Sequence, residues 1–263
     1  MTRILSGVVM ASIAIGVLLF APPLIFFGFL AIVAGVALWE YFGLLKSGGE
    51  PFLPLTGFAL AMGIYATLCF NAPQYFYMIA SMSLVIAFAA AILTGADDPS
   101  RSTSNTVFGI FYVSLTFGAM AMIVNMAEGA KFLLMIGVTN AACDTFAYYT
   151  GRTFGKNPLA PKISPKKTVE GFIGGLAGSV IGAALFQMFY VKTLPLNHAL
   201  VMGLIIGLVG PLGDLAESAI KRKMDVKDSG GIIPGHGGVL DRMDSLMFSA
   251  VVIYAYLKLA AGA

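Results

Sequence analysis

The chain has 263 residues, of which 58% are hydrophobic and only 11% are charged, and its mean hydropathy is +0.88. A soluble globular domain carries about 25% charged residues, so this composition excludes that class. One helical span needs about 20 apolar residues. The sequence therefore predicts an all-α, polytopic membrane helical bundle with about nine transmembrane helices.

Apolar runs follow one another along the chain with short breaks. They predict helices near residues 4–20, 24–45, 54–70, 75–95, 105–124, 129–149, 171–190, 198–220 and 240–260. Turn-forming residues separate the runs, for example Pro22-Pro23 and Asp97-Asp98-Pro99. Arg3 before the first run is also typical of a signal peptide, but Pro22-Pro23 leads directly into another run and no small-x-small cleavage site follows. We expect about five N-terminal transmembrane helices in residues 1–128 and a catalytic region in residues 129–263.

Lys and Arg residues are distributed unevenly between the two sides that nine spans would create. Twelve of the sixteen fall on the side of the N-terminus and three on the other side, while Arg242 falls inside the last predicted span. Because loops rich in Lys and Arg stay in the cytoplasm, the first side is predicted to be cytoplasmic. Nine of the twelve lie in residues 151–170 and 221–238, a concentration that topology alone does not explain. We expect a multi-pass protein of the inner (cytoplasmic) membrane whose active site faces the cytoplasm.

Ionisable residues continue from these two basic segments into the adjoining helices, where charge is costly and indicates a functional site. The sixth, eighth and ninth predicted helices carry Asp144; Asp214, Glu217, Ser218 and Lys221; and Asp241 and Asp244. Offsets of three, four and seven residues place the members from one helix on one face. The carboxylates are therefore expected at the cytoplasmic ends of the C-terminal helices.

Carboxylates that face lysines and arginines have a structural and a functional interpretation. In the structural one, they form ion pairs that hold the helices together. In the functional one, they bind Mg²⁺, which usually keeps waters and substrate phosphate oxygens as its other ligands, while the basic residues bind the phosphates. The functional interpretation indicates phosphoryl or nucleotidyl transfer at a membrane surface.

Two alternatives come from the same residues. Asp144, Asp214 and Glu217 near a helix interrupted at Pro211 could bind the cation of a cation-coupled transporter. His236 and Asp241 form an H-x4-D pattern, as in lipid acyltransferases, although this pattern is short and common by chance.

Two segments of the sequence resemble one known family. The first contains Ser218-Ala219-Ile220-Lys221-Arg222, Lys227-Asp228-Ser229-Gly230, Pro234-Gly235-His236-Gly237-Gly238 and Asp241-Arg242-Met243-Asp244. It resembles the defining motif of the bacterial phosphatidate cytidylyltransferases, also called CDP-diacylglycerol synthases. The second contains Asp144, Gly151-Arg152 and Ile163-Ser164-Pro165-Lys166-Lys167-Thr168-Val169-Glu170-Gly171, and it resembles an upstream segment of that family.

The resemblance implies an enzyme of phospholipid biosynthesis that transfers CMP from CTP to phosphatidic acid and releases pyrophosphate. It implies Mg²⁺ as the cofactor, with a second or monovalent cation left open. CTP, phosphatidic acid and the lipid bilayer are the implied partners, and a homodimer is expected. No nucleic acid is expected to bind.

The resemblance also implies roles for individual residues. The metal ligands would be Asp214, Asp241 and Asp244. The catalytic residues would be Asp214, Ser218, Lys221, Arg222, Lys227, Asp228, His236, Asp241 and Asp244. The substrate-binding residues would be Asp144, Arg152, Ser164, Lys166, Lys167, Glu170, Glu217 and Arg242. A phosphate monoester is already largely ionised near neutral pH, so the reaction does not require His236 as a general base.

Overall fold

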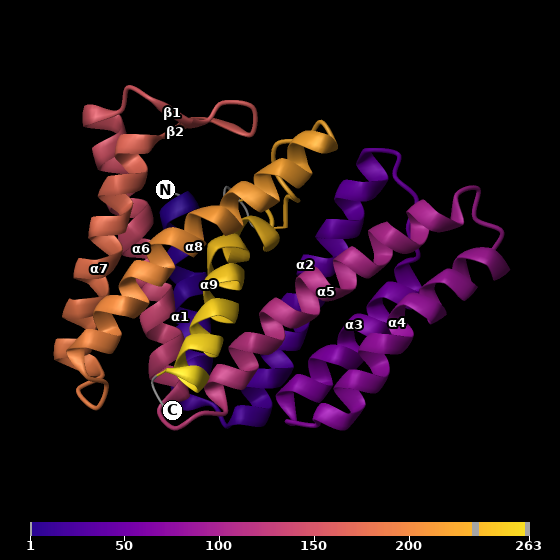
Figure 1. Cartoon of the computed structure of the whole chain (residues 1–263), viewed down its shortest axis with the longest axis horizontal. Helices are drawn as coiled ribbons and strands as arrows, with labels where there is room; N and C mark the ends of the chain where they lie inside the picture. Colours follow the sequence, from indigo (N-terminus) through magenta and orange to yellow (C-terminus); the bar gives the residue numbers. More distant parts are fainter. Residues whose placement is uncertain (1, 233–236, 261–263) are drawn as a thin grey trace. The chain divides into compact units, whose positions relative to one another are not determined.

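The computed structural model describes residues 2–232 and 237–260, and the predicted catalytic residue His236 lies outside them (Figure 1). In chain order the elements are α1 (Thr2–Phe20), α2 (Pro23–Ser47), α3 (Pro54–Cys69), α4 (Pro73–Leu93), α5 (Pro99–Val124), α6 (Gly129–Phe154), β1 (Pro158–Ala160), β2 (Ser164–Thr168), α7 (Val169–Tyr190), α8 (Leu196–Lys223) and α9 (Leu240–Leu259). Each apolar run of the sequence coincides with one helix. The predicted helical class is confirmed.

Five of the nine helices in the described part of the chain are long and apolar enough to cross a membrane, namely α2, α4, α5, α7 and α8. Two shorter apolar helices lie at Ser6–Phe20 and in α3. The helices α6 and α9, with 26 and 20 residues, are long enough but less apolar, because they carry polar residues such as Asp144 and Asp241. The structure thus supports five long spans, and the expectation of about nine stays a prediction.

Four helices of the N-terminal half begin with proline. Pro23, Pro54, Pro73 and Pro99 are the first residues of α2, α3, α4 and α5. Proline suits the first helical position because its fixed φ is already helical and its missing N–H is not needed there. The breaks between apolar runs in the sequence are therefore helix boundaries.

The chain forms two compact units. The first comprises Met1–Asn125 and Ile220–Arg242, and the second comprises Met126–Ala219 and Met243–Ala263. The segment 220–242, which carries much of the C-terminal motif, thus packs with the N-terminal helices. This packing gives α2 to α5 a direct structural connection to that motif.

The buried Glu50 carboxylate is the centre of an ion-pair cluster in the first unit, and its basic partners Arg101 and Lys223 are exposed. Its carboxylate accepts two hydrogen bonds of 2.6 Å from the Arg101 guanidinium and one of 3.2 Å from Asn105 Nδ2. Lys223 Nζ lies 3.5 Å from Glu50 Oε1. The hydrogen bonds from Arg101 are the main reason why the pKa of Glu50 falls from 4.5 to about 2. The cluster fastens the α2–α3 connection to the start of α5 and the end of α8.

The low pKa of Glu50 predicts how stability depends on pH. A carboxyl group whose pKa is lower in the folded protein stabilises it above its unfolded pKa, and this contribution is lost as the pH falls. The melting temperature of the wild type should therefore drop between pH 4.5 and pH 2 more steeply than that of Glu50→Gln. Thermal unfolding in detergent measures this, and parallel curves for the two proteins would contradict the prediction.

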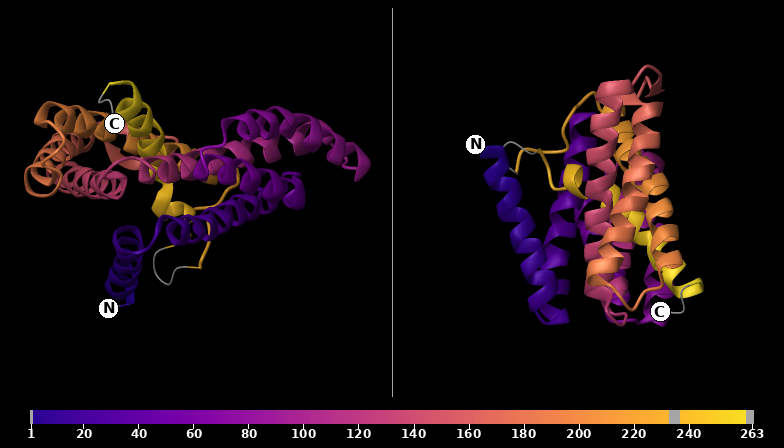
Figure 2. Two further views of the ribbon diagram at one scale, coloured as in Figure 1. Left: turned by 90° about the horizontal axis from the view of Figure 1, so that it is seen from below. Right: turned by 90° about the vertical axis from the view of Figure 1, so that its left-hand side faces the viewer.

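In the second unit, α6 and α7 lie side by side and the β1–β2 hairpin joins their ends (Figures 1 and 2). A Cβ added to Gly174 would lie 2.3 Å from Thr150 Oγ1, and one added to Gly178 would lie 2.5 Å from Phe146 Cβ. Small residues allow such close helix packing within membranes. The hairpin was expected only as a basic loop, and the structure shows that part of this loop is antiparallel sheet, with Pro158 opposite Thr168 and Ala160 opposite Ser164.

Candidate active site

A cavity of about 470 Å³ opens in the second unit. Its walls come from α6, the hairpin, α7 and α8, and they include Asp144, Arg152, Lys166, Lys167 and Asp214 among the polar residues and Leu159, Phe172 and Pro211 among the apolar ones. Three basic and two acidic side chains thus meet apolar walls in one hollow. A phosphorylated molecule with an apolar part would find complementary chemistry on these walls.

Hydrogen bonds at the two ends of the β1–β2 hairpin hold the hairpin in place. Thr168 caps α7, because its Oγ1 accepts a hydrogen bond of 3.1 Å from Gly171 N. The Glu170 carboxylate accepts hydrogen bonds from Lys156 N at 3.1 Å and from Asn157 N at 3.2 Å. Glu170, which was expected to bind substrate, thus ties the first turn of α7 to the segment after α6. These contacts fix the strand that carries Lys166 and Lys167.

Lys167 connects the hairpin to α8. Its Nζ lies 2.5 Å from Asp214 Oδ2, and the two side chains are 28% and 35% exposed. Arg152, near the end of α6, donates a hydrogen bond of 3.0 Å from Nη1 to the Tyr148 hydroxyl. The sequence grouped these residues from separate segments, and the structure places them around one cavity.

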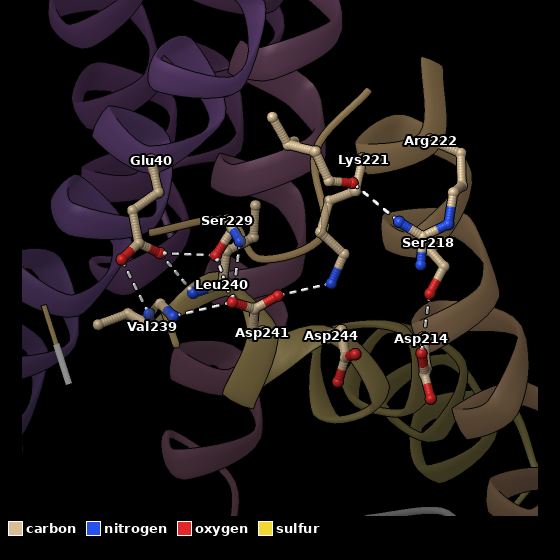
Figure 3. A network of polar contacts seen from close by, with 12 residues as sticks. Glu40, Asp214, Ser218, Lys221, Arg222, Ser229, Val239, Leu240, Asp241 and Asp244 are labelled. Atoms are coloured by element: carbon tan, nitrogen blue, oxygen red, sulfur yellow. Dashed lines mark hydrogen bonds and ion pairs between the residues drawn. The ribbon is translucent and has the colours of Figure 1, made fainter. Parts of the chain in front are cut away.

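Asp244 is brought close to Asp214 by the contact between α8 and α9. A Cβ added to Gly213 would lie 2.4 Å from the Asp244 carbonyl oxygen, so the two backbones touch there. Asp214 also accepts a hydrogen bond of 3.3 Å from Ser218 Oγ (Figure 3). Two predicted metal ligands, Asp214 and Asp244, therefore lie on touching turns of α8 and α9.

One helical turn away from these carboxylates, a buried hydrogen bond connects α6 to α9. Asn140 Oδ1 accepts a hydrogen bond of 3.2 Å from Ser249 Oγ, and Asn140 Nδ2 donates to Ile136 O at 3.0 Å. A Cβ on Gly210 would lie 2.4 Å from Asn140 Oδ1. Asn140 and Gly210 each precede a site carboxylate, Asp144 and Asp214, by four residues. The contact thus fixes the relative heights of α6, α8 and α9.

Replacing Asn140 should cost stability. In Asn140→Ala the hydroxyl of Ser249, which is fully buried, loses its acceptor, and a loss of about 1–3 kcal/mol in unfolding free energy is expected. Thr145→Ala is a suitable control on the same helix, because the exposed Thr145 hydroxyl donates its hydrogen bond within α6, to Ala141 O. Thermal or denaturant unfolding in detergent measures both, and equal effects would contradict the role given to Asn140.

Asp241 contacts the end of α8 and two residues that precede α9, Ser229 and Gly238, in the first unit. Its Oδ1 lies 2.5 Å from Lys221 Nζ, and these side chains are 6% and 9% exposed. Its Oδ2 accepts hydrogen bonds of 2.9 Å from both Ser229 N and Ser229 Oγ and one of 2.8 Å from Gly238 N. Figure 3 shows Asp241 at the centre of these donors.

Glu40 is a functional candidate that the sequence analysis missed. It lies on α2, is 1% exposed, and accepts hydrogen bonds from the start of α9 at Val239 N and Leu240 N. A charged residue inside the apolar run 24–45 is itself an indication of a site. The same rule that selected Asp144 would have selected Glu40.

The remaining predicted site residues differ in their exposure and position. Arg222, Lys227, Asp228 and Arg242 are exposed, and Ser164 begins β2. Glu217 is fully buried on α8 and is not among the described residues that line the cavity. Within residues 2–232 and 237–260, no group of three or more His, Cys, Asp and Glu side chains could hold a metal ion by itself.

A model described as "Cytidylyltransferase family" matches residues 1–260 of the chain. The chain belongs to the cytidylyltransferase family. The family resemblance predicted from the two polar segments is thereby confirmed, and membership in this family extends over the N-terminal helices as well.

Three bacterial relatives in this family carry the name phosphatidate cytidylyltransferase. The one from Staphylococcus saprophyticus is 35% identical over 253 residues, which cover 94% of each chain. The one from Bacillus subtilis is 42% identical over 149 residues, covering 56% of this chain and 55% of the relative. The one from Mycobacterium tuberculosis is 40% identical over 170 residues, covering 63% of this chain and 51% of the relative. The last two matches span only about half of each relative.

Proposed function

We propose that this protein transfers CMP from CTP to phosphatidic acid, forming CDP-diacylglycerol and pyrophosphate. The observation that carries the proposal is the cavity of the second unit, which Lys166, Lys167 and Arg152 line together with Asp144, Asp214 and apolar side chains. A lipid with a phosphate head group matches both kinds of wall. The names of the relatives supply the identity of the reaction.

The reaction needs positioning and charge stabilisation more than acid–base chemistry. An oxygen of the phosphatidic acid phosphate forms a bond to the α-phosphorus of CTP. The bond from that phosphorus to the bridging oxygen of the β-phosphate breaks, and its electron pair leaves with pyrophosphate. The attacking phosphate is already largely ionised near neutral pH, so no side chain has to remove a proton from it.

The basic residues of the hairpin and of α6 bind and orient the phosphates in this proposal. Lys167 stands 2.5 Å from Asp214, so its ammonium group lies beside a proposed metal ligand. Arg152 extends from the end of α6 and can offer paired donors to a phosphate. These side chains would hold attacking and leaving oxygens in line, which is how most phosphoryl-transfer enzymes gain their rate.

The carboxylates fit a magnesium ion by their chemistry. Mg²⁺ prefers oxygen ligands and usually takes one or two carboxylates, while waters and substrate phosphates complete its shell. We propose Asp214 and Asp244, on touching turns of α8 and α9, as ligands. Asp241, in the first turn of α9, is the third ligand that the family resemblance implies. When bound, the ion would neutralise charge that develops on the α-phosphate and on pyrophosphate.

Two further expectations about the setting stay predictions. The uneven distribution of Lys and Arg supports an active site on the cytoplasmic side of the inner membrane. The homodimer is implied by the family resemblance alone. In this setting the lipid tails would remain in the bilayer while CTP arrives from the cytoplasm.

Purified protein in detergent, given phosphatidic acid, CTP and Mg²⁺, should release pyrophosphate and form CDP-diacylglycerol. A cation-coupled transporter or an acyltransferase would release none under these conditions. Omitting either phosphatidic acid or Mg²⁺ should abolish the release. Absence of pyrophosphate with all three components present would refute the proposal.

Lys167→Met should lower kcat/KM for phosphatidic acid by about 10- to 100-fold, because a charged hydrogen bond contributes about 1.5–3 kcal/mol. Lys162→Met is the matched control, since Lys162 is exposed in the turn of the same hairpin and is not among the described cavity residues. Initial rates at varied phosphatidic acid measure the effect. A Lys162 variant as impaired as the Lys167 variant would show that only the overall charge of the hairpin matters.

A further inference from the structure

Glu40 is a carboxylate buried among the N-terminal helices that contacts residues about 200 positions later in the chain. Its Oε1 accepts a hydrogen bond of 3.0 Å from Val239 N, and its Oε2 accepts one of 2.7 Å from Leu240 N. Ser229 Oγ lies 3.3 Å from the same Oε2. The side chain is 1% exposed. A buried charge is costly unless hydrogen bonds compensate it, so these contacts are what makes Glu40 tolerable there.

The contacts of Glu40 complete the N-terminus of α9. The first amides of a helix have no partner within the helix, and α9 begins at Leu240. A carboxylate near a helix N-terminus is stabilised by these amides and by the helix dipole. Here the capping carboxylate comes from α2, a different helix of the same unit. The start of α9 is therefore held by the N-terminal half of the chain.

Gly230 and Gly238 also lie close to the Glu40 carboxylate. A Cβ added to Gly230 would lie 2.8 Å from Glu40 Oε1, and one added to Gly238 would lie 2.6 Å from Oε2. Glu40 and Asp241 both approach the Ser229 hydroxyl, at 3.3 Å and 2.9 Å (Figure 3). Displacement of Glu40 would therefore disturb the donors that orient Asp241.

We propose that Glu40 is a positioning residue for cytidylyl transfer, which fixes Ser229, Val239 and Leu240 and thereby the orientation of Asp241. This inference rests on the proposed function. Glu40 acts through Ser229 and the amides of Val239 and Leu240. The proposal gives α2 a role in the reaction, although the two motif segments lie in the C-terminal half of the chain.

Glu40→Gln is the most direct test, because the amide keeps the shape of the side chain but turns an NH₂ group toward donors. Loss of residues that orient a metal ligand commonly lowers activity or metal affinity by about 10- to 100-fold. We expect a fall of that size in kcat and a rise in the Mg²⁺ concentration needed for half-maximal rate. KM for phosphatidic acid should keep its wild-type value, since the hairpin lysines are untouched. A loss of folded protein alone would not shift the Mg²⁺ dependence.

Two control comparisons separate positioning from general stability. Glu50→Gln removes another buried acid of the same unit, and it should lower the melting temperature without changing kcat or the Mg²⁺ dependence.

Gly230→Ala crowds Glu40 without replacing it, whereas an added methyl at Gly231 meets nothing within 4 Å. Gly230→Ala should therefore reproduce the kinetic change of Glu40→Gln, and Gly231→Ala should not. This pair keeps the test decisive if Glu40→Gln fails to fold.

Hydrogen exchange gives a readout independent of activity. The amides of Val239 and Leu240 should exchange faster in Glu40→Gln and Gly230→Ala than in the wild type, while amides in α4 exchange as before. An active wild type with unchanged kcat and Mg²⁺ dependence in both variants would overturn the role of Glu40 and leave the proposed function standing. A wild type that releases no pyrophosphate would overturn the proposed function and the catalytic role together, even if the exchange result held.

Discussion

Asp214→Asn should lower the rate of pyrophosphate release by about a thousandfold, because a metal ion supplies several kcal/mol of charge stabilisation and each 1.36 kcal/mol is about tenfold in rate. The folded protein should be almost as stable as the wild type. Asp214 and its partner Lys167 are 35% and 28% exposed, and ion pairs that reach solvent contribute little to stability. The variant should therefore be folded and nearly inactive.

Asp225→Asn serves as the control for this change. Asp225 is exposed just after α8 and has φ of 55°, a left-handed conformation that Asn also adopts readily. This variant thus removes the same charge 11 positions later in the sequence without strain, and its turnover should match the wild type. The two variants are compared by pyrophosphate release at saturating CTP and by melting temperature. Wild-type turnover in Asp214→Asn would remove Asp214 from the metal site.

The helices could be predicted from the sequence because their limits are set by local chemistry. The prolines that start α2 to α5 act within a single turn. The length of the apolar runs between them is sufficient to predict helices. The β1–β2 hairpin was missed, because two strands of 3 and 5 residues leave little periodic signal in the sequence. The close packing of α6 on α7 could have been predicted, since Gly174, Gly178 and Gly182 recur at intervals of four.

The candidate site was only partly predictable, for a physical reason. Helical spacing places Asp214, Ser218 and Lys221 on one face, but it does not say which side chain of another segment meets them. The contact of Lys167 with Asp214 joins residues 47 positions apart, and that of Asn140 with Ser249 joins residues 109 positions apart. Such partners depend on the packing of α6, α8 and the hairpin. Glu40 precedes both basic segments by more than 100 positions, and only the folded chain brings it to Val239 and Leu240.

Asp241→Asn should have a large effect on stability as well as on turnover. Lys221 and Asp241 form a close pair that is less than one tenth exposed, and removal of one member of such a pair commonly costs about 3–5 kcal/mol. An amide at position 241 would also direct its NH₂ toward Lys221 or toward the donors of Ser229 and Gly238. The unfolding free energy should fall by an amount near the top of that range.

Lys221→Met tests whether the effect of Asp241 on stability can be separated from its effect on turnover. Asp241 would still accept hydrogen bonds from Ser229 and Gly238 in this variant, so its loss of stability should be smaller than that of Asp241→Asn. The double variant should regain part of the stability, because no buried charge of the pair is left without its counterpart. Turnover should stay lost in the double variant, since a regained fold does not restore a carboxylate ligand. Recovery of pyrophosphate release together with stability would mean that Asp241 serves the fold alone.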